Sequence, residues 1–259
     1  MPKKVRIAFM GTNGWYPTKT GNTVSALVET PERYIVLDAG DGLFGLDSFA
    51  PDNNRPVDLY LSHFHLDHVW GLHALPKMRF AAGITIWGQP GTKKALSLLL
   101  DHPFTTSLSE IRTRVSVREI GEGRHRIAEG CIVEAAPLVH ADPCFGYRFE
   151  LGMGKDMKAV AYCTDTGPCK NVARLGRNAD ALIMECGLLP GSPISPGWPH
   201  LTPEAAAKMA RESGCRRLYL THFAAHLYTD MRKRKMAETA AKKIFPRTTA
   251  ARDGLEIRI

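Results

Sequence analysis

Three histidines and one aspartate lie within six residues of one another in the stretch Ser62-His63-Phe64-His65-Leu66-Asp67-His68. The strand-like run Asp58-Leu59-Tyr60-Leu61 comes directly before them, so a turn at a strand end can point all four side chains into one space. Imidazole nitrogen and carboxylate oxygen are the ligands that zinc prefers, and alternate residues of an extended chain project to the same side. The cluster therefore predicts a metal site built on His63, His65, Asp67 and His68.

Two divalent ions need more ligands than these four residues supply, and the additional ones are expected directly after other strands. The chain has three such residues: His140, Asp165 and His222 each follow an apolar, strand-like run. Each of them alone could equally be a polar residue that merely ends a strand. Because the loops at one edge of a sheet sandwich converge, the three residues together with the cluster predict a site for two metal ions.

The elements that must position these residues are short apolar runs separated by turn signals. Strands are predicted at residues 5–9, 23–28, 34–37, 59–61, 84–87, 132–136, 145–151, 158–162, 181–184 and 217–220. Helices are predicted at residues 41–49, 68–75, 92–100, 205–212 and 230–244. Runs of strands with interspersed helices indicate an α+β fold in which two mixed sheets pack together with helices outside, a four-layer αββα sandwich.

Composition sets further limits. The 259 residues contain no Ser/Gly linker and no low-complexity run, and 44% of them are hydrophobic, which favours one domain over residues 1–259. We find no signal peptide and no membrane-spanning run, so no membrane partner is expected. The six cysteines include no C-x-x-C pair, which is typical of reduced thiols in the cytoplasm.

The charge balance favours anionic partners. A net charge of +8 raises the local concentration of phosphate-bearing molecules. The densest basic run, Arg232-Lys233-Arg234-Lys235, falls in a predicted helix, where four successive residues point around the whole cylinder. We expect a solvated helix surface there rather than a nucleic-acid contact.

The pattern H-x-H-x-D-H, followed by spaced His, Asp and His, resembles the metallo-β-lactamase superfamily over nearly the whole chain. The resemblance divides seven ligands between two ions: His63, His65 and His140 for the first, Asp67, His68 and His222 for the second, and Asp165 as a bridge. Asp38, in Leu37-Asp38-Ala39-Gly40, matches the early aspartate of the family, which supports the cluster without binding metal.

Other motifs resemble one branch of that superfamily, the phosphodiesterases that include ribonuclease Z. Thr164-Asp165-Thr166-Gly167 is similar to that branch, whereas the best-known β-lactamases carry cysteine in place of Asp165, so antibiotic hydrolysis is not expected. His200, before Thr202-Pro203, matches a histidine that reaches the substrate phosphate. His200 is then a general acid or a stabiliser of the transition state, and its alternative role is a loop histidine that packs against the next helix.

The chain also departs from ribonuclease Z. That family carries a long arm that grips transfer RNA, inserted between the positions of His140 and Asp165, and only 24 residues lie between them here. Leu66 replaces a glycine common in the ribonuclease Z cluster. The cyclic phosphodiesterase of phosphonate breakdown is closer in size, but its extra structural zinc on early cysteines is not expected, since the first cysteine here is Cys131.

The resemblance implies a dinuclear metal-dependent hydrolase, a phosphodiesterase in which a metal-bridging hydroxide attacks phosphorus. Asp67 would orient the attacking water or accept its proton, and His200 would protonate the departing oxygen. Zinc is the default metal, with manganese and iron as alternatives. The expected substrate is an anionic small molecule or nucleotide, with nucleic acid left open, and the arm-less relatives imply a homodimer.

Two alternatives stay open on the same scaffold. One is a lactone, thioester or carboxylic-ester hydrolase, because the same hydroxide serves carbonyl and phosphoryl centres. The other is a non-catalytic or redox metal-binding module. The Pro- and Gly-rich stretch 187–199, which contains Trp198, is either a pocket wall or lid or a plain connection.

Overall fold

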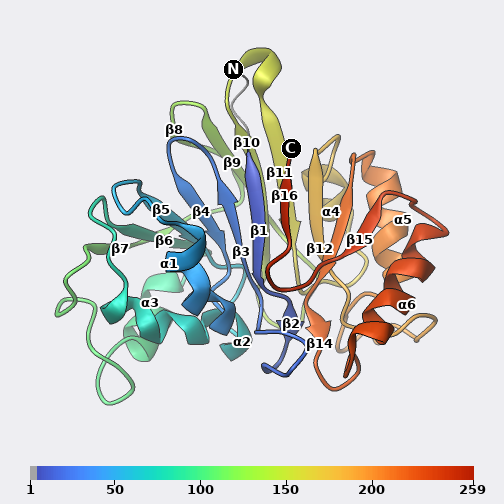
Figure 1. The fold of residues 1–259 in the computed structure, drawn as a ribbon, viewed down its shortest axis with the longest axis horizontal. Coiled ribbons are helices and arrows are strands. Elements are labelled where there is room, and N and C mark those ends of the chain that lie inside the picture. The colour runs from blue at the N-terminus through green and yellow to red at the C-terminus, as the bar shows by residue number, and fades with distance from the viewer. Residues whose placement is uncertain (1–4) are drawn as a thin grey trace.

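Two seven-stranded sheets pack face to face in the computed structural model, which describes residues 5–259 (Figure 1). The first has the order β16-β1-β3-β4-β5-β6-β7, with β1 at Arg6–Gly11, β3 at Ser25–Glu29, β4 at Tyr34–Leu37, β5 at Val57–Tyr60, β6 at Ile84–Gly88, β7 at Val115–Glu119 and β16 at Glu256–Arg258. The second has the order β15-β13-β12-β11-β10-β9-β8, with β8 at Gly123–Ala128, β9 at Cys131–Pro137, β10 at Phe145–Leu151, β11 at Lys158–Cys163, β12 at Ala181–Glu185, β13 at Leu218–Thr221 and β15 at Thr248–Ala250. A short parallel pair joins β2 (Asn13–Gly14) to β14 (Phe223–Ala224).

Helices cover the outer face of each sheet (Figure 1). On the first sheet lie the 3-10 helix η1 (Asp41–Gly45), α1 (Leu46–Phe49), α2 (Leu66–Val69), the 3-10 helix η2 (Trp70–Lys77) and α3 (Thr92–Leu99). On the second lie α4 (Lys170–Leu175), α5 (Pro203–Ser213) and α6 (Met231–Lys242). A short 3-10 helix, η3 (Gly154–Asp156), joins β10 to β11.

Three apolar clusters hold these layers together. One lies between the two sheets and includes Phe9, Phe149 and Tyr219. The other two pack the first sheet on its helices, as at Leu72, and the second sheet on its helices, as at Leu175. This order of layers confirms the predicted αββα sandwich.

Both sheets are mixed, as predicted, because each contains antiparallel and parallel pairs. In the first sheet β1, β3 and β4 pair antiparallel, and β4, β5, β6 and β7 pair parallel. In the second, β8 to β11 pair antiparallel, and β11, β12, β13 and β15 pair parallel. The four residues of β4 are all buried, as expected for a central strand that is covered on both faces.

The sequence signals place some helix ends well and others less well. At the start of α5 the Thr202 side chain accepts a hydrogen bond from the Ala205 backbone, and Gly214 ends the helix with a left-handed φ of 68°. The predicted helix at 68–75 instead begins at Leu66 as α2 and continues from Trp70 as the 3-10 helix η2. The prediction omitted the strands β2, β7, β8, β14, β15 and β16 and the helices η3 and α4.

One part of the basic run is not solvated, which corrects the expectation for that helix. Arg232 and Lys235 are exposed, but Arg234 is fully buried. Its guanidinium donates to the Thr12 hydroxyl at 2.7 Å, to the Ala251 carbonyl at 3.2 Å and to the Asn13 side chain. Burial lowers the pKa of Arg234 to about 10, so the residue stays charged at neutral pH. Arg234 therefore ties α6 to the connection between β1 and β2.

No helix within residues 5–259 combines the length and the apolar character that a membrane crossing requires.

Candidate dinuclear metal centre

Polar residues gather at one edge of the two sheets, directly after the strands. Asp38 follows β4 and the His63 to His68 cluster follows β5, which runs parallel to β4. In the second sheet Asp165 follows β11 and His222 follows β13, and both strands run parallel to β12. His140 follows β9, which has the same direction as β11 because both pair antiparallel with β10. Parallel strands end at the same edge, so all these side chains meet there.

Three of these residues have a left-handed backbone. The φ angle is 57° at Asp38, 52° at Asp165 and 51° at His222. This region is uncommon for residues other than glycine, although Asp and His enter it more readily than most, and each case costs on the order of 1–3 kcal/mol. The fold holds Asp38, Asp165 and His222 in this unfavourable conformation after three separate strands. Such recurrence is typical of residues at a functional site.

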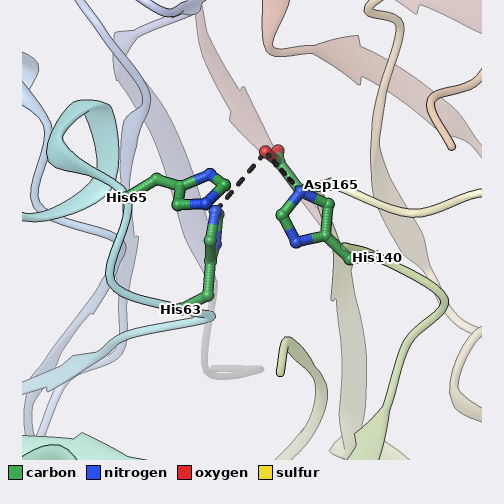
Figure 2. A group of neighbouring side chains, drawn as sticks. All are labelled: His63, His65, His140 and Asp165. Carbon is green, nitrogen blue, oxygen red and sulfur yellow. Dashed lines mark ion pairs between the residues drawn. The ribbon is translucent and has the colours of Figure 1, made fainter. Parts of the chain in front are cut away.

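The first group of candidate ligands comprises His63, His65, His140 and Asp165, whose ligand atoms all lie within 4.8 Å of one another and could hold a metal ion (Figure 2). The Asp165 Oδ2 atom lies 3.6 Å from Nε2 of His63 and 4.0 Å from Nε2 of His140. Both nitrogens are buried and lack a hydrogen-bond partner. Because buried polar atoms are rarely left unpaired, these two nitrogens fit ligands of an ion.

The second group comprises Asp67, His68 and His222, again with ligand atoms within 4.8 Å of one another. Nε2 of His222 lies 3.2 Å from Asp67 Oδ2, 3.1 Å from His68 Nε2 and 3.1 Å from Asp165 Oδ1. Asp165 thus turns Oδ2 toward the first group and Oδ1 toward the second. This is the arrangement that a shared carboxylate ligand requires.

Two imidazoles, those of His68 and His65, each bind a carboxylate through one ring nitrogen. Nδ1 of His68 lies 2.8 Å from Asp38 Oδ2, and Asp38 also accepts hydrogen bonds from the Ser62 backbone at 2.7 Å and the Tyr162 hydroxyl at 2.7 Å. Asp38 therefore lies where the sequence places a supporting residue. A carboxylate on one ring nitrogen leaves the other nitrogen free to bind metal.

His65 has the same kind of support from a residue that the sequence did not indicate. Its Nε2 atom lies 2.8 Å from Oδ2 of the exposed Asp142, so its Nδ1 atom is the one left for an ion. Asp142 is one more polar residue in a short loop, and its partner lies 77 positions earlier in the chain. No local pattern distinguishes such a residue.

The charge of the site also suits a cation. Burial disfavours the charged form of Asp165, but His222 and His68 hold the pKa of its carboxyl well below the usual range. Burial lowers the pKa of His63, which favours the neutral, metal-binding imidazole. His68 is opposite: burial works against its protonation, yet Asp165, Asp38 and Asp67 raise its pKa well above the usual value. Three carboxylates around one imidazole form an anionic pocket that a divalent ion would neutralise.

His200 lies beside the two groups and is paired with a buried carboxylate. Its Nδ1 atom is 3.0 Å from Oε1 of Glu185, the last residue of β12. Glu185 is fully buried and also accepts hydrogen bonds from the backbones of Thr166 at 2.6 Å, Leu201 at 3.1 Å and Gly187 at 3.1 Å. Burial opposes protonation of His200, but the Glu185 carboxylate raises its pKa to about 9. His200 is therefore oriented and protonated at neutral pH.

Glu185 is not among the predicted site residues, although its position in the sequence carries a signal. Glu185 ends the apolar run Ala181–Met184 in the same way that Asp38 and Asp165 end theirs. Asp165 was selected because it follows a strand-like apolar run, and the same reason makes Glu185 a candidate.

These residues border a cavity of about 440 Å³. It is lined by Trp15, Phe64, His65, Leu66, Asp67, Asp165, Trp198, His200 and His222. Trp198 is the one residue of the stretch 187–199 that lines this cavity, so the stretch contributes to the cavity wall.

Gly14 in β2 provides a test of how tightly His222 must be held. A Cβ atom at Gly14 would lie 2.5 Å from Cε1 and 2.7 Å from Nε2 of His222, too close for any side chain. We expect Gly14→Ala to displace the imidazole and to lower metal affinity and turnover by about 10–100-fold, the size of effect found when a metal ligand loses its support. Elemental analysis and turnover of bis-p-nitrophenyl phosphate measure both.

Gly121→Ala is the matched control, because Gly121 is exposed and a Cβ there meets nothing within 4 Å. An unchanged metal content and rate in Gly14→Ala would mean that the position of His222 is unimportant for the site.

This chain is similar to known proteins in sequence. The family model described as the beta-lactamase superfamily domain matches residues 33–223. Ribonuclease Z of Bacillus licheniformis is 28% identical over 310 aligned positions that cover 98% of this chain and 99% of that protein. Ribonuclease BN of Cronobacter sakazakii is 26% identical, with 98% and 100% covered.

Solved structures share the fold. The metallo-beta-lactamase fold protein YhfI from Bacillus subtilis has a TM-score of 0.79 at 20% identity, covering 99% of this chain and 100% of that one. The short form of human tRNase Z has a TM-score of 0.74 at 22% identity, covering 97% and 98%. With the family model matching most of its length, this chain belongs to the β-lactamase superfamily.

Proposed function

We propose that this protein is a metal-dependent phosphodiesterase whose site binds two divalent ions. The observation that carries the proposal is the position of Asp165, whose two carboxylate oxygens face two separate groups of imidazoles. The relative named ribonuclease Z from Bacillus licheniformis, at 28% identity over almost the whole chain, supports phosphodiester hydrolysis over the other reactions of this fold.

The seven residues fit two ions as the resemblance implied. His63, His65 and His140 would hold one ion and Asp67, His68 and His222 the other, with Asp165 as a ligand of both. Zinc suits this set of nitrogen and carboxylate ligands, and manganese and iron are its competitors. When bound, such ions polarise a phosphoryl oxygen and lower the pKa of water toward neutrality.

The chain's own residues move the protons. The backbone N–H of Trp15 donates to Asp67 Oδ2 at 2.6 Å, which orients this carboxylate, and Asp67 can accept a proton from the attacking water. His200 donates its Nδ1 proton to Glu185, so its Nε2 proton is the one available to the departing oxygen. Asp67 and His200 both line the same cavity, so a base and an acid are available to one bound substrate.

The substrate is proposed to be an anionic nucleotide-type molecule. The net charge of +8 and the ribonuclease names of the relatives support this class. The segment between His140 and Asp165 consists of β10, η3 and β11, so it has no place for the transfer-RNA arm of ribonuclease Z. A cytoplasmic location, one domain over residues 1–259 and a homodimer remain predictions from the sequence.

The test combines metal content with substrate class. Elemental analysis should find about two divalent ions per chain, as expected for a two-metal hydrolase, and the protein should cleave bis-p-nitrophenyl phosphate faster than a lactone, a thioester or p-nitrophenyl acetate. Two ions with carbonyl hydrolysis alone would favour the lactone and thioester alternative. Redox-active iron without hydrolysis would favour the metal-binding module, and failure to bind any metal would refute the proposal.

A further inference from the structure

Two tryptophans from distant parts of the chain form the mouth of the cavity. The rings of Trp15 and Trp198 stack with centroids 5.8 Å apart and planes inclined at 28°. The two residues are 51% and 42% exposed, although both line the cavity beside the candidate ligands. Large apolar surface left open at a pocket is typical of a binding site, and a flat ligand that covers these rings removes that surface from water.

The structure holds both tryptophans in specific positions. Trp15 has a φ of 75°, which is rare for a bulky residue, while its backbone N–H binds the Asp67 carboxylate. The Trp198 ring lies nearly parallel to His65, with centroids 6.3 Å apart, and 5.8 Å from the ring of His200. A group attached to a phosphate between His65 and His200 therefore lies close to the ring of Trp198.

The charge of the cavity limits the kind of ligand. None of the nine described residues that line it is Lys or Arg, despite the net charge of +8. Proteins that bind long nucleic acids neutralise successive phosphates with Lys and Arg, and this cavity offers none. Its volume of about 440 Å³ falls in the range of roughly 300–1,000 Å³ that holds small molecules.

From these contacts we infer that the site selects a small nucleoside phosphodiester, whose base stacks on Trp198 and Trp15 while its phosphate reaches the metal-binding residues. The inference rests on the proposed phosphodiesterase function and adds the class of substrate. Stacking accepts any base, because every base has a planar face. Trp198 thus selects ligands that carry a base over ligands without one, whichever base it is.

Binding to the zinc-loaded protein tests the inference without hydrolysis. Adenosine 5′-monophosphate and ribose 5-phosphate differ only in the base, and calorimetry should show the first to bind about 10-fold more tightly, within the range that stacking one base provides. Trp198→Ala should remove this difference and leave ribose 5-phosphate unaffected, and Trp198→Phe should keep most of it. A short single-stranded RNA should bind no more tightly than the mononucleotide.

Trp70→Ala is the matched control, because Trp70 is 53% exposed but lines a neighbouring apolar cavity instead. Equal weakening of both ligands by Trp198→Ala, or equal affinity of the wild type for both, would overturn the inference. Much tighter, salt-sensitive binding of the RNA would overturn the restriction to small substrates. A protein that prefers the mononucleotide but cleaves no phosphodiester would contradict only the proposed function, whereas cleavage without any preference for a base would contradict only the stacking.

Discussion

Replacing Asp165 by alanine is expected to strip the protein of metal and to lower phosphodiester hydrolysis by more than about 100-fold, because losing a mere supporting residue already costs 10–100-fold. The two oxygens of Asp165 lie 3.6 Å from His63 Nε2 and 3.1 Å from His222 Nε2, so one substitution removes a ligand from both groups. Of the six ligands that remain after the substitution, only Asp67 is a carboxylate. Elemental analysis after dialysis and turnover of bis-p-nitrophenyl phosphate give the two readouts.

Asp47→Ala is the control, since Asp47 is an exposed carboxylate in α1 away from the site. Asp165→Asn keeps the shape and loses the charge, so it should bind metal more weakly than the wild type but better than Asp165→Ala. If Asp165→Ala retained two ions per chain and normal turnover, the two groups would not share a ligand.

The candidate ligands could be predicted because the signal is local. His63, His65, Asp67 and His68 are adjacent in the sequence, and the others each follow a strand whose apolar run is easily recognised. The strand at 145–151 occupies the same residues in the structure, and from Tyr147 to Leu151 its burial alternates as its polarity does. The layer order follows from the same runs, because sheets with two apolar faces must be covered on both sides.

The features that the sequence did not reveal depend on distant partners. Glu185 meets His200 and Asp142 meets His65 only in the folded chain. The place of Glu185 at a strand end makes it a candidate but does not name its partner, and no local pattern identifies Asp142. Strand β7 was not predicted, because none of its residues is fully buried and its hydrophobic pattern in the sequence is weak.

The burial of Arg234 cannot be predicted from the composition of the basic run. A run of four basic residues is usually solvated, yet a helix that packs on a sheet must turn one of four successive residues inward. Arg234 is that residue, and it is accommodated because Thr12, Asn13 and Ala251 supply oxygen acceptors. These acceptors come from elements far away in the sequence, so only the tertiary structure could reveal the burial.

Replacing His200 by alanine is expected to lower turnover of a substrate with an alkoxide leaving group by about 10²–10⁴-fold, the contribution typical of a positioned general acid. Metal content should stay at the wild-type value, because the seven proposed ligands remain. The effect should be much smaller on bis-p-nitrophenyl phosphate, whose leaving group needs little protonation. Adenosine 2′,3′-cyclic phosphate, which expels an alkoxide, is the contrasting substrate, and His226→Ala is the control, since His226 is exposed in the loop after His222.

Glu185→Gln extends this test to pH. The Glu185 carboxylate overcomes the effect of burial and raises the pKa of His200 to about 9, so the acid form of the imidazole is kept below that pH and lost above it. The neutral amide removes the charge that favours protonation, and the pKa of His200 should fall. The basic limb of the pH–rate profile for adenosine 2′,3′-cyclic phosphate should therefore move to lower pH in Glu185→Gln and disappear in His200→Ala. The contrary outcome is that His200→Ala slows both substrates equally and Glu185→Gln leaves the basic limb unshifted. His200 and Glu185 would then hold α5 and the cavity wall and take no part in proton transfer.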